Sequence, residues 1–257
     1  MKNCSAVIIT YNEERNIERC LQSVKDIADE IVVVDSFSTD STPAICARYG
    51  VRFIQHAFGG YIEQKNFALS QASNDYVLSL DADEAIDERL KQNILDEKQN
   101  GFLYDCYKMN RSNYFCGRWI KHGSWYPDKK IRLINRQKAN WGGINPHDKI
   151  IMQLQSSVKW LAGDILHYTY YTVEELVAQT NRFTTIQAKA MFESNRKAGF
   201  VKLYISPLSA FITGYFVKLG FLDGYDGFII ARSVAYGTML KYAKLKQLLN
   251  NGSKTKV

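Results

Sequence analysis

The chain of 257 residues is 46% hydrophobic and 23% charged, which is the composition of a globular protein long enough to bury a full core. Its five cysteines are odd in number and include no C-x-x-C pair, which argues against a disulfide-based fold and favours a reducing compartment. The formal net charge of +7 is uneven, because residues 194–257 hold ten Lys or Arg and two acidic side chains. This excess of positive charge predicts an anionic partner, membrane or nucleic acid, for the C-terminal quarter.

Through the first eighty-odd residues, apolar strands alternate with helices. Continuous apolar runs predict strands that are covered on both faces; they lie at residues 6–10, 31–35, 51–55 and 76–80. This alternation implies a mostly parallel sheet built by right-handed crossovers, and so an α/β fold. The first strand begins without a signal-peptide pattern before it, and we therefore expect a cytoplasmic protein.

Polar residues indicate where the helices between these strands begin and end. Asn12 is a candidate N-cap for the first helix. Pro43 suits the first turn of the second helix and Gly50 its C-terminal end. Asp81 and Asp83 follow the fourth strand and allow two interpretations: they bind a metal or a phosphate at the carboxyl edge of the sheet, or they cap the helix that follows.

From residue 101 to residue 170 the pattern changes to short strands among tryptophan-rich turns. The strand-like pieces lie at residues 102–104, 131–134, 149–152 and 165–168. We expect a smaller, partly antiparallel extension that completes the sheet and forms one wall of the site. Trp125 and Trp141 either stack on sugar rings or pack in the core.

The C-terminal region is predicted to be helical. One apolar face of a helix over residues 172–197 consists of Val173, Leu176, Val177, Thr180 and Phe183. Residues 203–217 carry no charge and are interrupted by Pro207 and Gly214, and this run is shorter than the about 20 residues that a spanning helix needs. We expect it to lie in a membrane interface between Lys202 and Lys218; a buried helix pair or a dimer interface is the alternative.

A basic amphipathic helix is predicted over residues 229–249, and residues 250–257 are expected to fray. Its basic residues are Arg232, Lys241, Lys244 and Lys246. We therefore divide the chain into a domain of residues 1–170, with halves of about 1–100 and 101–170, and a helical, membrane-associating region of residues 171–257.

Three strand ends carry motifs by which the chain resembles a known family. Residues 10–13 read T-Y-N-E, residues 35–42 match D-x-x-S-x-D-x-T, and residues 81–83 match D-x-D. In this order the motifs resemble the inverting family 2 glycosyltransferases. The resemblance implies the GT-A fold, a Rossmann-like, mostly parallel sheet with helices on both faces. No G-x-G-x-x-G follows the first strand and no G-x-x-x-x-G-K-[ST] occurs, which argues against a dinucleotide site and a P-loop.

Further segments are similar to the lipopolysaccharide core glycosyltransferases, above all to those that add glucose to an inner-core heptose. These segments are residues 126–133, 141–148, 167–170 and 220–224. One departure is Asp148, where that group more often has Glu after the histidine.

The resemblance implies a UDP-sugar site with Mg²⁺ or Mn²⁺ as cofactor. Asp83 is the expected direct metal ligand, while Asp81 contacts the ribose or reaches the metal through water. His167 is a third metal ligand, a phosphate contact or a structural histidine. The other residues expected to bind the donor are Thr10, Tyr11, Glu13, Asp35, Lys65 and Ala82.

Several of these residues keep a structural alternative. Asp35 either accepts a hydrogen bond from uracil or is an ordinary strand-end carboxylate. Lys65 either contacts the donor phosphates or is a solvated surface lysine. Arg132 either binds a phosphate or forms a salt bridge, and Tyr11 lines the pocket or simply packs.

An inverting transfer needs a general base to accept the proton of the attacking hydroxyl group. The first candidate is Asp148 and the second is Asp128, with His147 expected beside the site.

These inferences together predict a glycosyltransferase at the cytoplasmic face of the inner membrane. It would transfer a hexose, with glucose as the first candidate, from a UDP-sugar to a lipid-linked glycan such as the lipopolysaccharide inner core. The basic C-terminal region would contact anionic lipid, and nucleic acid is not expected. The alternatives are transfer to polyprenyl phosphate or a capsule precursor, a sugar-1-phosphate nucleotidyltransferase and a non-catalytic membrane adaptor.

Overall fold

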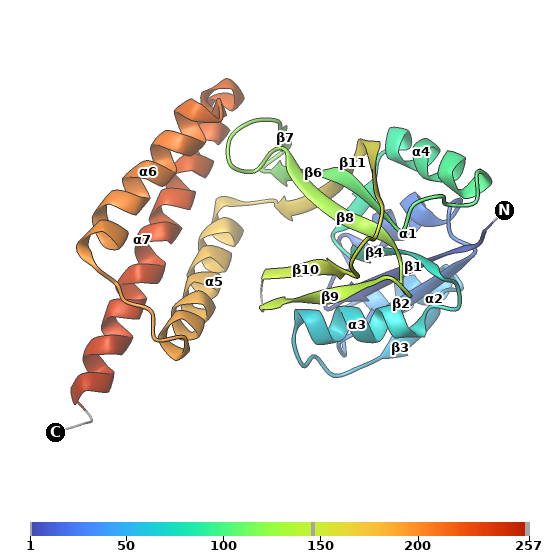
Figure 1. Ribbon diagram of the computed structural model, residues 1–257, viewed down its shortest axis with the longest axis horizontal. Coiled ribbons are helices and arrows are strands. Elements are labelled where there is room, and N and C mark those ends of the chain that lie inside the picture. The colour runs from blue at the N-terminus through green and yellow to red at the C-terminus, as the bar shows by residue number, and fades with distance from the viewer. Residues whose placement is uncertain (1, 145–146, 255–257) are drawn as a thin grey trace. The chain divides into compact units, whose positions relative to one another are not determined.

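The computed structural model describes residues 2–144 and 147–254 of the chain (Figure 1). It consists of two compact units. The first comprises Met1–Ser112 with Asp128–Tyr168, and the second comprises Asn113–Pro127 with Thr169–Val257. Residues 113–127 therefore group with the C-terminal helices, although the sequence placed them with the sheet.

A nine-stranded sheet has the strand order β3-β2-β1-β4-β8-β6-β11-β5, and β7 pairs with β6. Its first four strands are parallel: β3 (Arg52–Gln55), β2 (Glu30–Asp35), β1 (Cys4–Thr10) and β4 (Tyr76–Asp81). Antiparallel pairing begins at β8 (Asp128–Asn135), which lies between β4 and β6 (Cys106–Phe115). The remaining strands are β5 (Glu84–Ile86), β7 (Arg118–Ile120), β11 (Val158–Tyr170) and the separate antiparallel pair β9 (Ala139–Ile144) and β10 (His147–Met152). The predicted α/β sheet with an antiparallel extension is thus confirmed.

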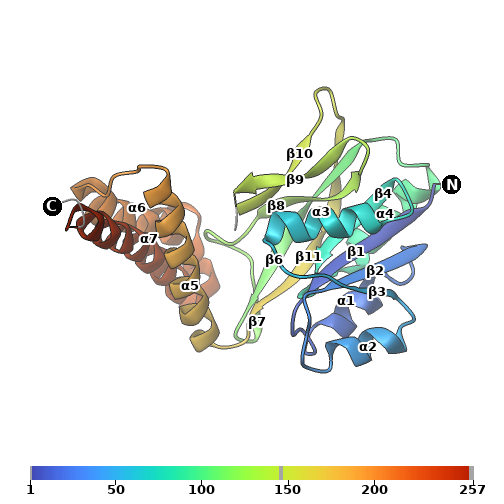
Figure 2. The ribbon, with the colours of Figure 1, turned by 90° about the horizontal axis from the view of Figure 1, so that it is seen from below.

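Helices cover both faces of the parallel strands (Figure 2). One face packs against α1 (Ile17–Val24), α2 (Thr42–Arg48) and α4 (Glu88–Gln99), and the other against α3 (Tyr61–Gln71) and β9. Alternation along β1 explains this, because Ala6 and Ile8 belong to one core and Val7 to the other.

Two of the predicted helix caps are wrong. Asn12 has a positive φ of 54°, and its side chain accepts a hydrogen bond from the Thr39 N–H at 2.8 Å instead of capping α1. Asp87 caps α4 by accepting from the Leu90 N–H at 2.7 Å, and β5 separates Asp83 from that helix. The capping interpretation of Asp81 and Asp83 is therefore excluded.

The strand expected at residues 102–104 is also wrong. This segment is a loop in which Phe102 is buried and Leu103 is exposed. The Tyr76 hydroxyl group donates to the Phe102 carbonyl at 2.8 Å, and β6 begins only at Cys106. Apolar content at this position reflects burial of single rings rather than strand pairing.

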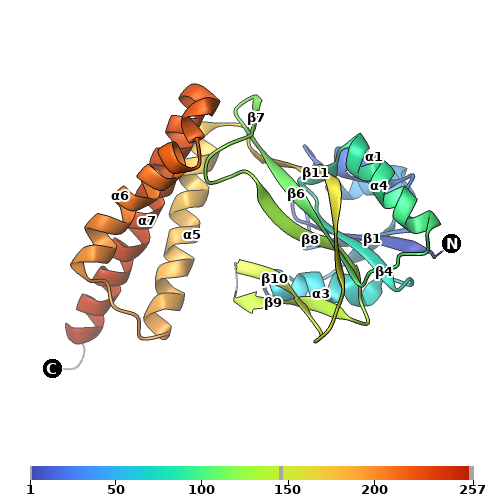
Figure 3. The ribbon, with the colours of Figure 1, turned by 45° about the horizontal axis from the view of Figure 1, so that its top comes forward.

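The second unit contains three long helical segments. A capping box between Thr172 and Glu175 begins α5 (Val173–Glu193), whose expected apolar face is only partly buried, since Val173 and Val177 are exposed. The next segment runs without a break as η1 (Val201–Ile205), α6 (Ser206–Ile212) and η2 (Thr213–Val217). The short η3 (Gly220–Asp223) leads into α7 (Gly224–Lys254), on which both α5 and α6 pack (Figure 3).

The chain stays helical through Pro207 and Gly214, but the helix type changes beside them: the π-helical η1 ends at Ile205, and Gly214 lies in the π-helical η2. One further prediction for this unit is wrong. Residues 250–254 continue α7 instead of fraying, and residues 255–257 lie outside the described residues. Within the described residues no single helix is long and apolar enough to cross a bilayer; the pair Val201–Val217 and Gly220–Asn251, bent by 71°, meets that criterion together.

Candidate active site

The carboxyl ends of β1, β2 and β4 meet at one edge of the sheet. The strand register pairs Thr10 with Asp35 and Ile9 with Asp81. Ligands of open α/β sheets bind at this edge. The fold thus brings together three strand ends that are far apart in the sequence.

Two buried cations, Lys65 and Arg132, lie beside Asp81. The Lys65 Nζ atom is 3.0 Å from Asp81 Oδ1, and the Arg132 Nη2 atom is 3.2 Å from Asp81 Oδ2. Lys65 is only 3% exposed, so the interpretation as a solvated surface lysine is wrong. Arg132 forms the salt bridge that was one of its two alternatives.

Trp141 forms the floor beneath these two cations. Its ring centroid is 4.4 Å from the Lys65 Nζ atom and 5.0 Å from the Arg132 Cζ atom. The ring is buried, and its Nε1–H donates to the Ser79 hydroxyl group at 3.3 Å. For Trp141 the packing alternative is therefore the observed one. Trp125, in the second unit, packs with Phe115 and Tyr170.

A fully buried carboxylate, Glu84, organises the arginines. Its Oε1 atom accepts from Arg132 Nη2 at 2.8 Å and from Arg111 Nη1 at 3.0 Å. Burial alone would raise the pKa of the Glu84 carboxyl, but the charges of Arg132 and Arg111 hold it well below its ordinary value. Sequence reasoning missed Glu84 and Arg111, because an acid near the start of a helix has an ordinary structural explanation.

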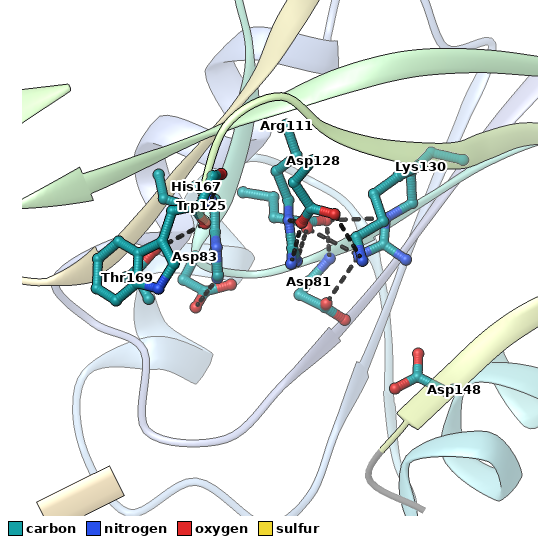
Figure 4. Close-up of polar contacts among 12 residues, drawn as sticks. Asp81, Asp83, Arg111, Trp125, Asp128, Lys130, Asp148, His167 and Thr169 are labelled. Carbon is teal, nitrogen blue, oxygen red and sulfur yellow. Dashed lines mark hydrogen bonds and ion pairs between the residues drawn. The ribbon is translucent and has the colours of Figure 1, made fainter. Parts of the chain in front are cut away.

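Asp128, the second candidate base, lies in the same charged cluster (Figure 4). Its Oδ2 atom is 2.8 Å from Arg111 Nη2, and its Oδ1 atom is 3.1 Å from Lys130 Nζ. Two cations therefore hold this carboxylate.

Asp148, the first candidate base, is held by one lysine. Its Oδ2 atom is 2.8 Å from the Lys65 Nζ atom, so Lys65 bridges Asp81 and Asp148. Burial would raise the pKa of the Asp148 carboxyl, but Lys65 and Arg132 lower it below its ordinary value. The side chain of His147 lies outside the described residues.

Asp83 differs from these carboxylates. Its Oδ2 atom is 3.2 Å from His167 Nε2 (Figure 4), and within the described part of the chain no Lys or Arg lies within ion-pair distance of it. The residues 2–144 and 147–254 contain no group of three His, Cys, Asp or Glu side chains close enough to hold a metal ion. Asp81, Asp83 and His167 therefore do not form a closed metal site.

Glu13 and Thr10 lie at the end of β1. Burial, and next the charge of Asp83, raises the pKa of the Glu13 carboxyl to about 7. The buried Thr10 Oγ1 atom has no hydrogen-bond partner among the described residues. Tyr11 is 58% exposed, so its packing alternative is wrong.

Two other expected donor residues are fully or almost fully buried. Asp35 accepts from the backbone N–H and the hydroxyl group of Ser38, and so holds the loop after β2. The Ala82 side chain packs in the core, while its backbone N–H donates to the Ile9 carbonyl at 3.1 Å.

Comparison with known proteins adds a family assignment. Residues 5–159 match the model of the glycosyl transferase family 2. The chain is 33% identical to an uncharacterized glycosyltransferase of Rickettsia typhi over 96% of this chain and 88% of that protein. It is 30% identical to the lipopolysaccharide core biosynthesis glycosyltransferase LpsC of Rhizobium meliloti, over 95% of this chain and 92% of LpsC. Among solved structures, S. aureus TarS aligns with 90% of this chain and 55% of its own, at 18% identity and a TM-score of 0.47.

Proposed function

This chain belongs to glycosyltransferase family 2, and from that premise we propose that it transfers a hexose, glucose first, from a UDP-sugar to a lipid-linked glycan such as the lipopolysaccharide inner core. The observation that carries the proposal is the contrast among the strand-end carboxylates. Asp81, Glu84, Asp128 and Asp148 are each neutralised by Lys or Arg. Asp83 is 27% exposed, and among the residues that the structure describes only His167 lies within ion-pair distance of it. Similarity to LpsC along nearly the whole chain supports the acceptor class.

Asp83 and His167 would hold the divalent cation. Carboxylate oxygen suits Mg²⁺ or Mn²⁺, and a pair of protein ligands leaves positions for phosphate oxygens and water. Such a cation offsets the negative charge that develops on a diphosphate leaving group. Asp81, already paired with Lys65 and Arg132, is better placed to contact the donor than to bind the metal directly.

The donor's other contacts follow from the residues at the same edge. Lys65 and Arg132 supply fixed positive charge for the diphosphate. The Thr10 hydroxyl group, which has no hydrogen-bond partner in the described part of the chain, and the exposed Tyr11 ring are available to the nucleotide. The Asp35 carboxylate accepts two hydrogen bonds from Ser38 and retains lone pairs with which it would accept from uracil.

Asp148 is our candidate for the general base. In the transfer, the acceptor oxygen forms a bond to the anomeric carbon, the bond to UDP breaks with its electron pair leaving on the diphosphate, and the hydroxyl proton passes to the carboxylate. The Lys65 contact keeps Asp148 ionised but weakly basic. A diphosphate that attracted Lys65 would loosen this contact and raise the basicity of Asp148.

The proposed location is the cytoplasmic face of the inner membrane, with anionic lipid as a partner of the C-terminal unit. All five cysteines are unpaired, which agrees with a reducing compartment. Nucleic acid has no part in the proposal.

The test is release of UDP from several UDP-sugars, with and without Mn²⁺, in the presence of lipid-linked core glycan or polyprenyl phosphate. We expect turnover with UDP-glucose and core glycan that depends on Mn²⁺, and its loss by at least about 100-fold in Asp83→Asn. Asp96→Asn, which removes an exposed carboxylate from α4, is the matched control and should keep full activity. Full activity of Asp83→Asn would overturn the assignment of Asp83, and turnover with polyprenyl phosphate alone would replace the proposed acceptor.

A further inference from the structure

The helical segment of residues 201–217 turns its large apolar side chains away from the protein. Val201, Ile205, Leu208, Ile212 and Phe216 recur every three or four residues and are 43–60% exposed. A helix on the surface of a globular protein normally presents polar residues outward. Here the outward stripe is apolar along its whole length.

Exposed apolar side chains also lie on α7, where the Phe228 ring packs 6.0 Å from Phe211 and 5.8 Å from Tyr215 of the 201–217 segment. Tyr225, Phe228 and Met239 are exposed at 76%, 40% and 40%. Together, the stripe of residues 201–217 and these three side chains are called the outer apolar face below. Isolated exposed apolar residues are common, but a contiguous set marks an interaction surface.

Glycines make close backbone contacts where η2, η3 and the start of α7 meet. A Cβ atom added at Gly227 would lie 1.8 Å from the Gly220 carbonyl oxygen, and one at Gly220 would lie 2.6 Å from the Gly214 carbonyl oxygen. Small residues at such contacts let backbones approach closely, as they do in helices that pack in lipid. The unit also buries large apolar side chains, among them Ile230 and Leu245.

Positive charge surrounds the outer apolar face. Lys202 and Lys218 are exposed at the two ends of the stripe, and Arg232 is exposed on α7. The two acidic residues of the region have partners within the second unit. Asp223 accepts hydrogen bonds from the ring and the backbone N–H of His122, and Asp226 pairs with Arg118 at 3.3 Å.

Two other lysines of α7 differ in their surroundings. Lys244 donates to Asn181, Thr184 and Thr185 of α5, so it faces inward. Burial, and next the charge of Lys202, lowers the pKa of Lys241.

We propose that the outer apolar face lies in the plane of an anionic phospholipid surface, with its rings and aliphatic chains at the headgroup–acyl boundary and Lys202, Lys218 and Arg232 at the level of the phosphates. This inference deepens the membrane partner of the proposed function and rests on it in that respect. Anionic lipid is favoured over a second copy of the chain, because two such faces would bring like charges together. Interfacial rather than spanning contact follows from the length of the stripe, because residues 201–217 are fewer than the about 20 that a spanning helix needs.

Vesicle sedimentation tests this surface with the full chain. We expect binding to vesicles of phosphatidylcholine with phosphatidylglycerol, weaker binding to phosphatidylcholine alone, and further weakening by salt. The double variant Leu208→Ser/Ile212→Ser should lower partitioning by about tenfold or more, since two buried aliphatic side chains are lost from the bilayer. Lys202→Gln/Lys218→Gln should lower it by roughly tenfold on the anionic vesicles only.

Matched controls lie in the first unit. Leu103→Ser/Leu154→Ser removes two leucines that are 77% and 98% exposed, and Lys25→Gln/Lys138→Gln removes two exposed lysines. Controls that bind like the parent support the proposal, whereas equal losses in control and test variants overturn it. A concentration-dependent dimer in light scattering that Leu208→Ser/Ile212→Ser dissociates, without any vesicle binding, would assign the face to a second copy instead.

UDP release without lipid separates this inference from the enzymatic one. Slow turnover of UDP-sugar with water as the acceptor depends on the strand-end site alone and should be equal in parent and Leu208→Ser/Ile212→Ser. Vesicle binding without turnover would contradict the proposed function, and turnover without vesicle binding would contradict the proposed surface.

Discussion

The two units place charge and apolar surface in opposite ways. In the first unit Glu84, Lys65 and Arg132 are each less than 5% exposed and form ion pairs. In the second, Val217 and Tyr225 are 71% and 76% exposed. Buried ions cost several kcal/mol each unless they are paired, and exposed apolar groups forgo about 25 cal/mol per Å². Neither arrangement maximises stability, and this contrast supports our two proposals: an ionic ligand for the first unit and an apolar, anionic surface for the second.

The largest expected effect is on the rate of sugar transfer, which depends on the first unit and not on the second. Asp148→Asn should lower kcat by about 10²–10⁴-fold, because proton transfer to a positioned base contributes that much. Vesicle binding should not change, since the substitution lies in the first unit. A smaller loss in Asp148→Asn than in Asp128→Asn, measured as UDP release, would move the role of base to Asp128.

The next effect is on stability and concerns the buried ion pairs of Glu84 with Arg111 and Arg132. Glu84→Gln should reduce the free energy of unfolding by about 3–5 kcal/mol, because it leaves two guanidinium groups without a full charge partner. Urea titration measures this directly. Glu18→Gln, which removes an exposed ion pair with Arg48 at 3.5 Å, is the control and should cost under about 1 kcal/mol. Equal costs would mean that the buried cluster is no more important than a surface pair.

A pH-dependent effect of intermediate size should arise at Glu13. Its carboxyl has a pKa of about 7 in the folded chain and 4.5 as its ordinary value, so the folded state binds the extra proton between these values. Stability from this group is therefore present at low pH and is lost as the pH rises from about 4.5 through 7. Glu13→Gln should be more stable than the parent at pH 8 by about 1–3 kcal/mol and similar at pH 4. Thermal unfolding at both pH values, with the surface substitution Glu88→Gln as control, would contradict this if the Glu13→Gln difference stayed constant.

A last effect, similar in size to that at Glu13, would test the inside of the helical unit. Gly227→Ala should cost about 1–3 kcal/mol, because its methyl group would meet the Gly220 carbonyl oxygen and force the first turn of α7 away from η3. Gly199→Ala has nothing within 4 Å of the added carbon and should be nearly neutral. Thermal unfolding of both variants decides the matter, and an unchanged Gly227→Ala would show that close backbone contact is not required.

Much of the first unit could be predicted from local pattern. Continuous apolar runs located the parallel strands to within about two residues, because strands covered on both faces need apolar side chains at every position. The motifs at the ends of β1, β2 and β4 likewise located the site edge, since parallel strands present their carboxyl ends on one side. The same local signals failed at Asn12 and Phe102, where a turn and single-ring burial imitate a cap and a strand.

The partnerships inside the site needed the tertiary structure. Lys65 reads as a surface lysine on a helix, yet the packing of α3 against β9 buries it between Asp81 and Asp148. Glu84 meets Arg111 and Arg132 across 27 and 48 positions of the chain, a distance that no local pattern encodes.

In the second unit, the sequence by itself determined that helices form, that residues 203–217 lack charge and that the region is basic. Only the tertiary structure decided which way the apolar side chains face, because periodicity defines a stripe but not its partner. Glycines let η2, η3 and the start of α7 approach closely, while the large side chains of the 201–217 stripe remain exposed. The direction of that stripe, set by packing rather than by composition, is what turns an ambiguous apolar run into a specific surface.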